Sequence, residues 1–301
     1  MFGIEYLMSS IEIFGMTFSY DLIGLSLSSY WPLIALIILI AIISEIIDSG
    51  LGMMYGTLVT VAMILLGFNP VLVIPSLLIS QAVGGLTGAG FHHKFSNADF
   101  RLNTEDTRIV FIIVIPGLLV ILLAVYIGLN ISIWILKSYI AVLVIFMGLF
   151  CAFPFKYQFD RKKMFVFSII AAFNKAISGE GFGPIVSTGN ILSGLDTRRA
   201  VATTTYSEAI ICIASFVAWN LLGGRILELW FPLTICIGAV IGASIGPRIT
   251  EKLKANWLKI VVGILAIISG IYLCYIIFIA LNNDFLKIIA DILESLVRFG
   301  I

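Results

Sequence analysis

The sequence predicts an all-α, polytopic membrane protein built from two inverted-topology repeats of about five apolar segments each, with broken or re-entrant helices at glycine-rich motifs. Composition, the length of the apolar stretches and a similarity between the halves support this prediction. Of 301 residues, 60% are hydrophobic and 12% are charged, and the mean hydropathy is +1.13. A soluble domain carries about 25% charged residues, so we expect lipid to cover much of the apolar surface.

Charge and cysteine usage argue against several classes of function. The net charge of +1 gives no electrostatic basis for a nucleic acid partner. The four cysteines lie in separate apolar segments without metal-ligand spacing, so we expect them to pack and to bind no metal. No Walker-type phosphate loop is found, and we expect no cofactor.

Several apolar stretches have the length of about 20 residues that a membrane-spanning helix needs. One of them contains a single acid, Glu208. The stretches are Val71–Phe91, Ile109–Leu129, Ser138–Phe155, Ala200–Gly224, Leu229–Pro247 and Ile260–Leu281.

Two other regions each read as a pair of half-length helices joined by a glycine-rich break. In the first, Trp31–Ile47 leads into Asp48–Gly52, and in the second, Met164–Ile177 leads into Ser178–Pro184. Such breaks persist at membrane depth only where protein buries them or where they line a watery cavity.

The two broken regions align as copies when Gly52 is set against Gly179. Without gaps, Gly56 then meets Gly183, Gly67 meets Gly194, and Ser80-Gln81-Ala82 meets Ser207-Glu208-Ala209. The chain therefore divides into two homologous halves.

Alternating crossings place thirteen of the eighteen Lys and Arg residues on one side. The positive-inside rule assigns that side to the cytoplasm of a cell (inner or plasma) membrane, with both termini outside. The halves then enter from opposite faces, as in many secondary transporters. The predicted parts are an extracytoplasmic segment 1–30 (an interfacial helix or an irregular cap), a first repeat 31–155, a cytoplasmic linker 156–163, a second repeat 164–281 and an amphipathic C-terminal helix 282–301.

Five charged residues fall at membrane depth, and each costs at least about 2.5 kcal/mol in hydrocarbon. They are Glu45, Asp48, Lys175, Glu180 and Glu208. Asp48 aligns with Lys175, and we predict that the two form an ion pair in one conformation and part in another. A desolvated carboxylate can take up and release a proton, so we assign the four acids to proton coupling.

Helices that begin after Gly52 and Gly181 would present unpaired N–H groups and a positive dipole end. Two such starts facing each other predict an anion-binding cradle. His92 and His93 lie beside Lys94, and we expect them in a solvated loop. The predicted substrate-binding residues are Ser49, Gly50, Gly52, Gly56, Thr57, Lys175, Ser178, Gly179, Gly181, Gly183, Thr188 and Asn190, with Ser187 as a further hydroxyl donor.

The two glycine motifs, Ile47–Gly56 and Ser178–Pro184, resemble those of the sulfite exporter TauE/SafE family, as does the stretch Leu195–Ala200. The resemblance extends from about Trp31 to Leu281. It implies an inner-membrane permease that moves sulfite, sulfonates or other small organic anions, usually outward.

The predicted function is a secondary transporter, and an exporter, of a small anion that works by alternating access with proton coupling and without enzymatic activity. A cation transporter and a passive channel stay open as alternatives, and an intramembrane enzyme is less favoured because no H-E-x-x-H or G-x-S-x-G motif is present. The expected partners are an anionic solute and membrane lipid, with a homo-oligomer left open.

Overall fold

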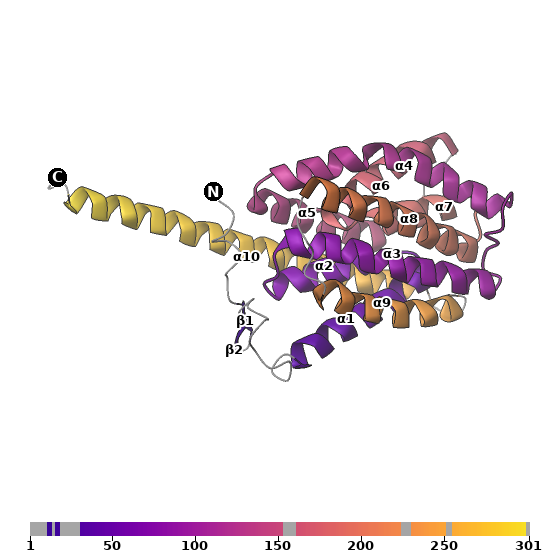
Figure 1. Ribbon diagram of the computed structural model, residues 1–301, viewed down its shortest axis with the longest axis horizontal. Coiled ribbons are helices and arrows are strands. Elements are labelled where there is room, and N and C mark those ends of the chain that lie inside the picture. Colours follow the sequence, from indigo (N-terminus) through magenta and orange to yellow (C-terminus); the bar gives the residue numbers. More distant parts are fainter. Residues whose placement is uncertain are drawn as a thin grey trace.

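The computed structural model describes residues 11–13, 16–18, 31–152, 161–223, 230–250 and 255–298. Within these ranges the regular secondary structure is helical apart from two three-residue strands (Figure 1). Seven of the described helices are long and apolar enough to cross a bilayer. The predicted all-α, polytopic membrane architecture is therefore confirmed.

Each half of the chain contributes five helices in the same order, with a short helix of 11 residues in second place. The first half holds α1 (Trp31–Leu51), α2 (Tyr55–Leu65), α3 (Pro70–Lys94), α4 (Glu105–Asn130) and α5 (Ile133–Ala152). The second half holds α6 (Arg161–Ser178), α7 (Phe182–Leu192), α8 (Thr197–Gly223), α9 (Trp230–Ile249) and α10 (Ala255–Arg298).

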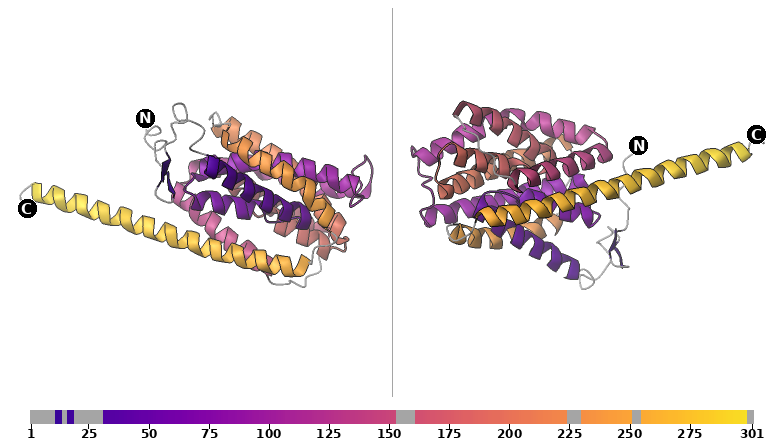
Figure 2. Two further views of the ribbon diagram at one scale, coloured as in Figure 1. Left: turned by 90° about the horizontal axis from the view of Figure 1, so that it is seen from below. Right: turned by 180° about the vertical axis from the view of Figure 1, so that it is seen from behind.

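The two ends of the chain differ from the predicted elements. Strands β1 (Ile11–Ile13) and β2 (Met16–Phe18) pair antiparallel, so an interfacial helix over these residues is wrong. At the other end, α10 runs for 44 residues without interruption and extends past the bundle (Figures 1 and 2). The predicted amphipathic helix 282–301 is thus a continuation of the last span up to Arg298. The linker 156–163 lies outside the described residues except for the first turn of α6.

The packing between helices repeats when the two halves are exchanged. α1 packs against α9, and its counterpart α6 packs against α4. α3 packs against α9, and α8 likewise packs against α4. The remaining large contacts, α3 with α8 and α5 with α10, join counterparts directly. The contact pattern therefore has the form expected of two copies related by a two-fold operation.

The two short helices also end in the same way, which shows that the repeat reaches local backbone geometry. Gly67 follows α2 with φ +91° and Gly194 follows α7 with φ +95°, a left-handed conformation that glycine adopts without steric cost. In each case the N–H groups of the glycine and of the residue after it donate to helix carbonyls. Both bonds are 3.0 Å long after α2, and they are 3.0 and 3.1 Å long after α7. This is a Schellman cap. Each helix therefore ends when its length is about half the thickness of a membrane.

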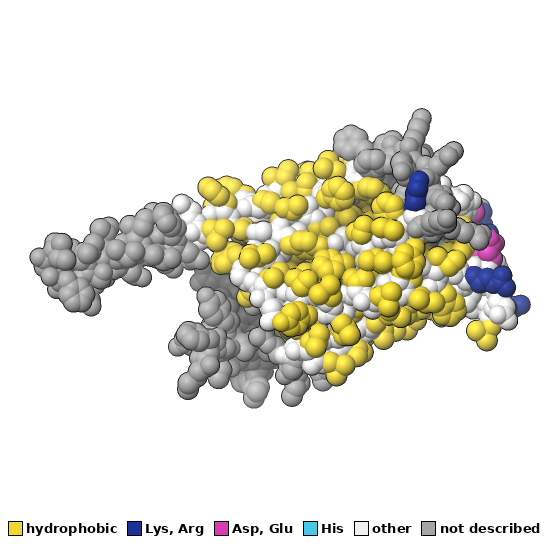
Figure 3. Space-filling model, turned by 90° about the horizontal axis from the view of Figure 1, so that it is seen from above, with side chains coloured by type: hydrophobic (Ala, Val, Ile, Leu, Met, Phe, Trp, Pro, Cys, Tyr) yellow, Lys and Arg dark blue, Asp and Glu magenta, His cyan; other side chains and the backbone are white. Residues whose placement is uncertain are grey.

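The face of the bundle that Figure 3 shows is a broad apolar belt, with Lys, Arg, Asp and Glu side chains gathered at one end. On α4, for example, Leu119 and Leu122 are 76% and 63% exposed. Arg199 at the start of α8 bonds Glu105 and Asp106 at the start of α4, at 2.7 and 2.8 Å. The loops before α4 and α8 and the last turn of α9, which were predicted to share a side, therefore meet at the same end, since Asn97 also donates to the Pro247 carbonyl.

Candidate functional site

The two helix breaks have matching backbone conformations. Gly52 and Gly179 have φ +73° and +79°, and two residues further on Met54 and Gly181 have φ +98° and +81°. The left-handed conformation is rare for a side chain such as that of Met54. Its presence indicates that the surrounding structure imposes the same turn on both copies.

The breaks lie against each other, and the contact is reciprocal. A methyl group added at Gly56 would overlap the carbonyl oxygen of Gly179. A methyl group added at Gly183 would lie 2.7 Å from the carbonyl oxygen of Gly52. Glycine is therefore required at both positions for this close approach of backbones.

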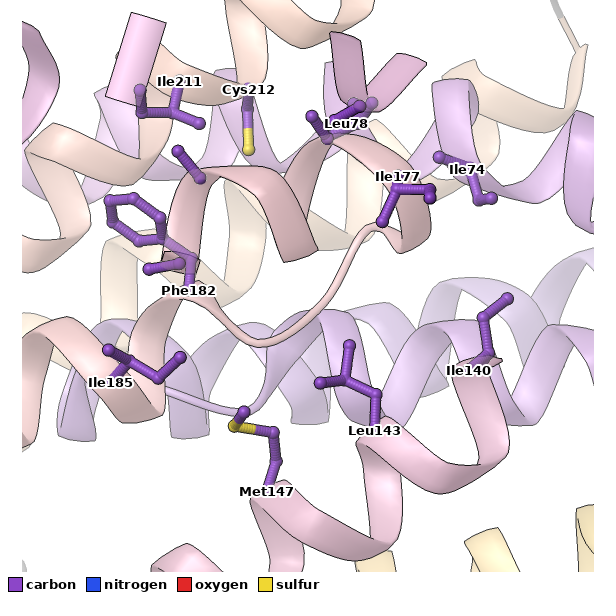
Figure 4. Packing of buried hydrophobic residues seen from close by; sticks show 14 of the residues in the cluster. Ile74, Leu78, Ile140, Leu143, Met147, Ile177, Phe182, Ile185, Ile211 and Cys212 are labelled. Carbon is purple, nitrogen blue, oxygen red and sulfur yellow. The ribbon is translucent and has the colours of Figure 1, made fainter. Parts of the chain in front are cut away.

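Apolar side chains enclose the second break. The irregular stretch of this break runs between helices whose apolar side chains pack around it (Figure 4). The 3.5 Å separation between a methyl group at Gly181 and Leu143 confirms how closely α5 approaches. The side chains around this stretch in the figure include Leu143 and Met147 of α5, Cys212 of α8, and Phe182 and Ile177 at its two ends.

Asp48 caps the first of the two helix starts. Its Oδ1 accepts a hydrogen bond from the Tyr55 N–H at 2.9 Å, and the side chain is 3% exposed. A carboxylate at the positive end of α2 is electrostatically favourable. The start of α2, predicted as one wall of an anion cradle, is thus already occupied by an anionic group of the protein, whereas α7 begins at Gly181 without a side-chain cap.

Lys175 is the buried cation at the centre of the site, with 1% of its surface exposed. Its Nζ lies 2.8 Å from Glu208 Oε1 and donates a second hydrogen bond to Gln81 Oε1. Gln81 in turn donates to Asp48 Oδ2 at 3.4 Å. In this conformation Lys175 pairs with Glu208, and Gln81 bridges to Asp48. The predicted Asp48–Lys175 ion pair, expected in one conformation and parted in another, stays a prediction. The partners differ from the predicted pair because the side chains of Gln81 in α3 and Glu208 in α8 extend to Lys175.

Two further carboxyl groups are buried without a hydrogen bond among the described residues. Glu45 in α1 and Glu180 in the second break are both 0% exposed, and neither oxygen of either group has a partner. Thr60 of α2, also 0% exposed, has an unpartnered hydroxyl and lies beside Glu180. An ionised carboxylate so placed is costly unless it is paired.

An aromatic N–H group satisfies the same carbonyl in each half. His92 Nε2 lies 2.9 Å from the Ser49 carbonyl oxygen, and Trp219 Nε1 donates to the Ala176 carbonyl at 2.7 Å. His92 is counterpart to Trp219, and Ser49 to Ala176, in the repeat alignment. A carbonyl oxygen only accepts, so the proton of His92 lies on Nε2, as it does on the indole nitrogen of Trp219. The other ring nitrogen, Nδ1, then accepts from Asn97 at 2.9 Å. His92 is therefore buried, and its predicted place in a solvated loop is wrong.

Several predicted binding residues face neighbouring helices instead of the contact between the breaks. Ser49 donates to the Glu45 carbonyl at 2.5 Å, and Ser49 and Gly50 both lie against Gly246 of α9. Asn190 donates to the Thr203 and Thr204 hydroxyls of α8 at 3.2 and 3.3 Å. These contacts fasten the half-helices to their neighbours.

Other predicted residues stay close to the breaks. Ser187 donates to the Leu51 carbonyl at 3.3 Å, across the contact between the halves. Ser178 donates to the Asn174 carbonyl at 2.6 Å and accepts from the Glu180 N–H at 3.3 Å. Thr57 is buried and Thr188 is half-buried.

Comparison with known proteins identifies the family of the chain. The sequence model of the sulfite exporter TauE/SafE family matches residues 36–273, which include both breaks and all ten helices in whole or in part. The chain belongs to this family. Members of the TauE/SafE family are membrane transporters, and the seven long apolar helices of this chain are in keeping with that class.

A curated relative points to the same class of protein. The chain is similar to "Probable membrane transporter protein YtnM" of Bacillus subtilis (strain 168), with 26% identity over 238 residues that cover 74% of this chain and 77% of the relative. No solved structure matches the chain.

Within this TauE/SafE chain, sequence reasoning missed the roles of several buried polar residues. Gln81 bridges two charged groups, Tyr55 bonds Ser80 at 3.0 Å, and Trp219 and His92 hold the carbonyls beside the breaks. The repeat alignment contained the signal for three of them, because Gln81 aligns with Glu208 and His92 with Trp219.

Proposed function

We propose that this TauE/SafE transporter is a secondary transporter that exports a small anion, such as sulfite, a sulfonate or another organic anion, by alternating access with proton coupling. The observation that carries the proposal is Lys175, the one Lys or Arg that is fully buried among the described side chains, placed between two glycine breaks. A buried ammonium four residues before the second break is a favourable place for a negative charge.

An inverted repeat provides the alternating access in this proposal. The exchange-symmetric packing, the paired left-handed glycines and the reciprocal contact of Gly56 and Gly183 support two equivalent halves. Rocking of one half against the other would then open the site first to one face and then to the other. The charged end that holds Arg199 would face the cytoplasm, in keeping with the excess of Lys and Arg predicted there.

Flux in proteoliposomes tests the proposal. Purified protein is reconstituted and screened against sulfite, sulfonates, carboxylates and simple cations, with and without a pH gradient. We expect saturable anion flux that responds to the gradient. Flux that does not saturate and ignores the gradient would instead indicate a passive channel.

Two substitutions probe the site, each with a matched control. Lys175→Ala and Gly181→Val should abolish anion flux while the protein still inserts. Lys94→Ala and Gly90→Val alter an exposed lysine and a glycine with open space around its Cβ position, and they should leave flux unchanged. Normal flux in both site variants would contradict the proposal.

A cation transporter is the second candidate. Glu45 and Glu180 favour it, since both are fully buried carboxyl groups without a hydrogen bond among the described residues. Saturable flux of a simple cation that is lost in Glu180→Gln, with no anion flux at all, would support this alternative.

A further inference from the structure

The positive charge of Lys175 is already balanced by Glu208 in this structure, so an anion can bind Lys175 favourably only if the charge of Glu208 is removed. Its Nζ forms a 2.8 Å ion pair with Glu208 Oε1, and both side chains are at least 96% buried. An ammonium has three donors, and Glu208 and Gln81 accept two of them. An anion that took the third donor while Glu208 stayed ionised would put two negative charges on one positive charge inside a low-dielectric site.

The surroundings of Glu208 make that extra negative charge harder to hold. Asp48 and Glu45 on α1 interact electrostatically with it, as does the thiol of Cys212 on its own helix. Lys175 is the positive group that faces it. The second oxygen of Glu208, Oε2, is buried and has no hydrogen-bond partner among the described residues, so it is free to take a proton.

The other half of the protein shows what a neutral group at this position does. Gln81 is the counterpart of Glu208 in the repeat, and it accepts a hydrogen bond from the same Lys175 ammonium without carrying a charge. A protonated Glu208 would resemble it: a neutral acceptor that leaves the positive charge of Lys175 uncompensated.

We infer that the anion and a proton bind together, by exchange of partners at Lys175: a proton from water binds Glu208 Oε2, and the anion takes the place of the carboxylate as counter-ion of the ammonium. This inference rests on the proposed function and deepens it, because it names the group that couples the two species. The site gains one anion and one proton, so its net charge is unchanged. Because each favours binding of the other, the anion and the proton cross the membrane together. Export then follows the outward gradient of the anion.

The test measures proton uptake on binding to the full-length protein in detergent. Methanesulfonate serves as the probe, because its charge does not change over the pH range used. Calorimetry in two buffers of different ionisation enthalpy should give about one proton taken up per anion, and affinity should fall about 10-fold per pH unit wherever one proton is taken up.

Glu208→Gln should bind methanesulfonate with no proton uptake and no pH dependence, because glutamine already accepts from this lysine at the counterpart position. Glu208→Asp keeps a titratable group and should keep the pH dependence. Glu105→Gln, at the charged end of the bundle, is the matched control and should behave as the wild type.

The outcomes separate the two proposals. Binding with full proton uptake in Glu208→Gln, or without proton uptake in the wild type, would overturn the partner exchange and leave anion transport standing. No binding to the wild type, together with no anion flux in proteoliposomes, would remove both.

Discussion

Alanine at Gly56 is the sharpest test of the contact between the two breaks. The added methyl group would overlap the Gly179 carbonyl oxygen and lie 3.2 Å from the Glu180 Cα. Both neighbours are backbone atoms, so no side chain can rotate away to relieve the overlap. Overpacking of this kind costs about 1–3 kcal/mol.

Gly90→Ala is the matched control. Gly90 is also a helical glycine, but an added methyl group there meets nothing within 4 Å. Alanine gains about 0.5–1 kcal/mol over glycine in a helix, and only Gly90→Ala realises this gain without a clash. The shift is about 2–4 °C per kcal/mol for chains of 150–250 residues and falls with length, so for this 301-residue chain the overlap should lower the melting temperature by at most about 12 °C relative to the control.

Thermal unfolding in detergent can be followed with a thiol-reactive fluorophore once the half-buried Cys151, Cys236 and Cys274 are replaced with alanine, because Cys212 is 0% exposed in the folded protein. Gly183→Ala should give a similar loss, since its methyl group would meet the Gly52 carbonyl and the Met53 Cα at 2.7 Å. The two substitutions act on one shared contact, so the double variant should lose less than the sum. Equal melting temperatures for Gly56→Ala and Gly90→Ala would refute the reasoning.

Three further substitutions test contacts near the breaks and at the charged end. Trp219→Phe leaves the buried Ala176 carbonyl without its donor and should cost about 1–3 kcal/mol, which a melting curve would register; an unchanged curve would show that another group replaces the indole. His92→Phe removes the matching donor to the Ser49 carbonyl and should lower the stability by a similar amount; a melting temperature equal to that of the wild type would contradict this. Arg199→Gln breaks an ion pair whose arginine is 35% exposed, so its effect should stay below about 1 kcal/mol and shrink further in high salt; a larger loss of stability would contradict this.

The glycine pattern made the architecture predictable. Apolar length identified the spans, and the shared register of Gly52 with Gly179 and of Gly67 with Gly194 located the breaks and the ends of the short helices. The physical reason is local, because a left-handed turn in a helix selects for glycine. Met54 shows the limit of that rule: it adopts the turn without being glycine, and nothing in its side chain indicates this.

Side-chain partners in the site were less predictable. Lys175 has Asp48 as its counterpart, yet its ion pair is with Glu208, because the choice depends on which side chains of α3 and α8 reach between the breaks. His92 was misplaced for a different reason. Its neighbour Lys94 suggested solvent, whereas the alignment with Trp219 pointed to a buried donor.

The bond between Trp219 and the Ala176 carbonyl gives the protein an intrinsic optical probe. The indole ring is 3% exposed, and its N–H group bonds a carbonyl three residues before Gly179. Indole emission is sensitive to the polarity around the ring, so any opening that loosens the end of α6 would shift the colour of this fluorophore. The sequence has four other tryptophans, and replacing them with phenylalanine would leave Trp219 as a single reporter that follows the break in real time without an attached label.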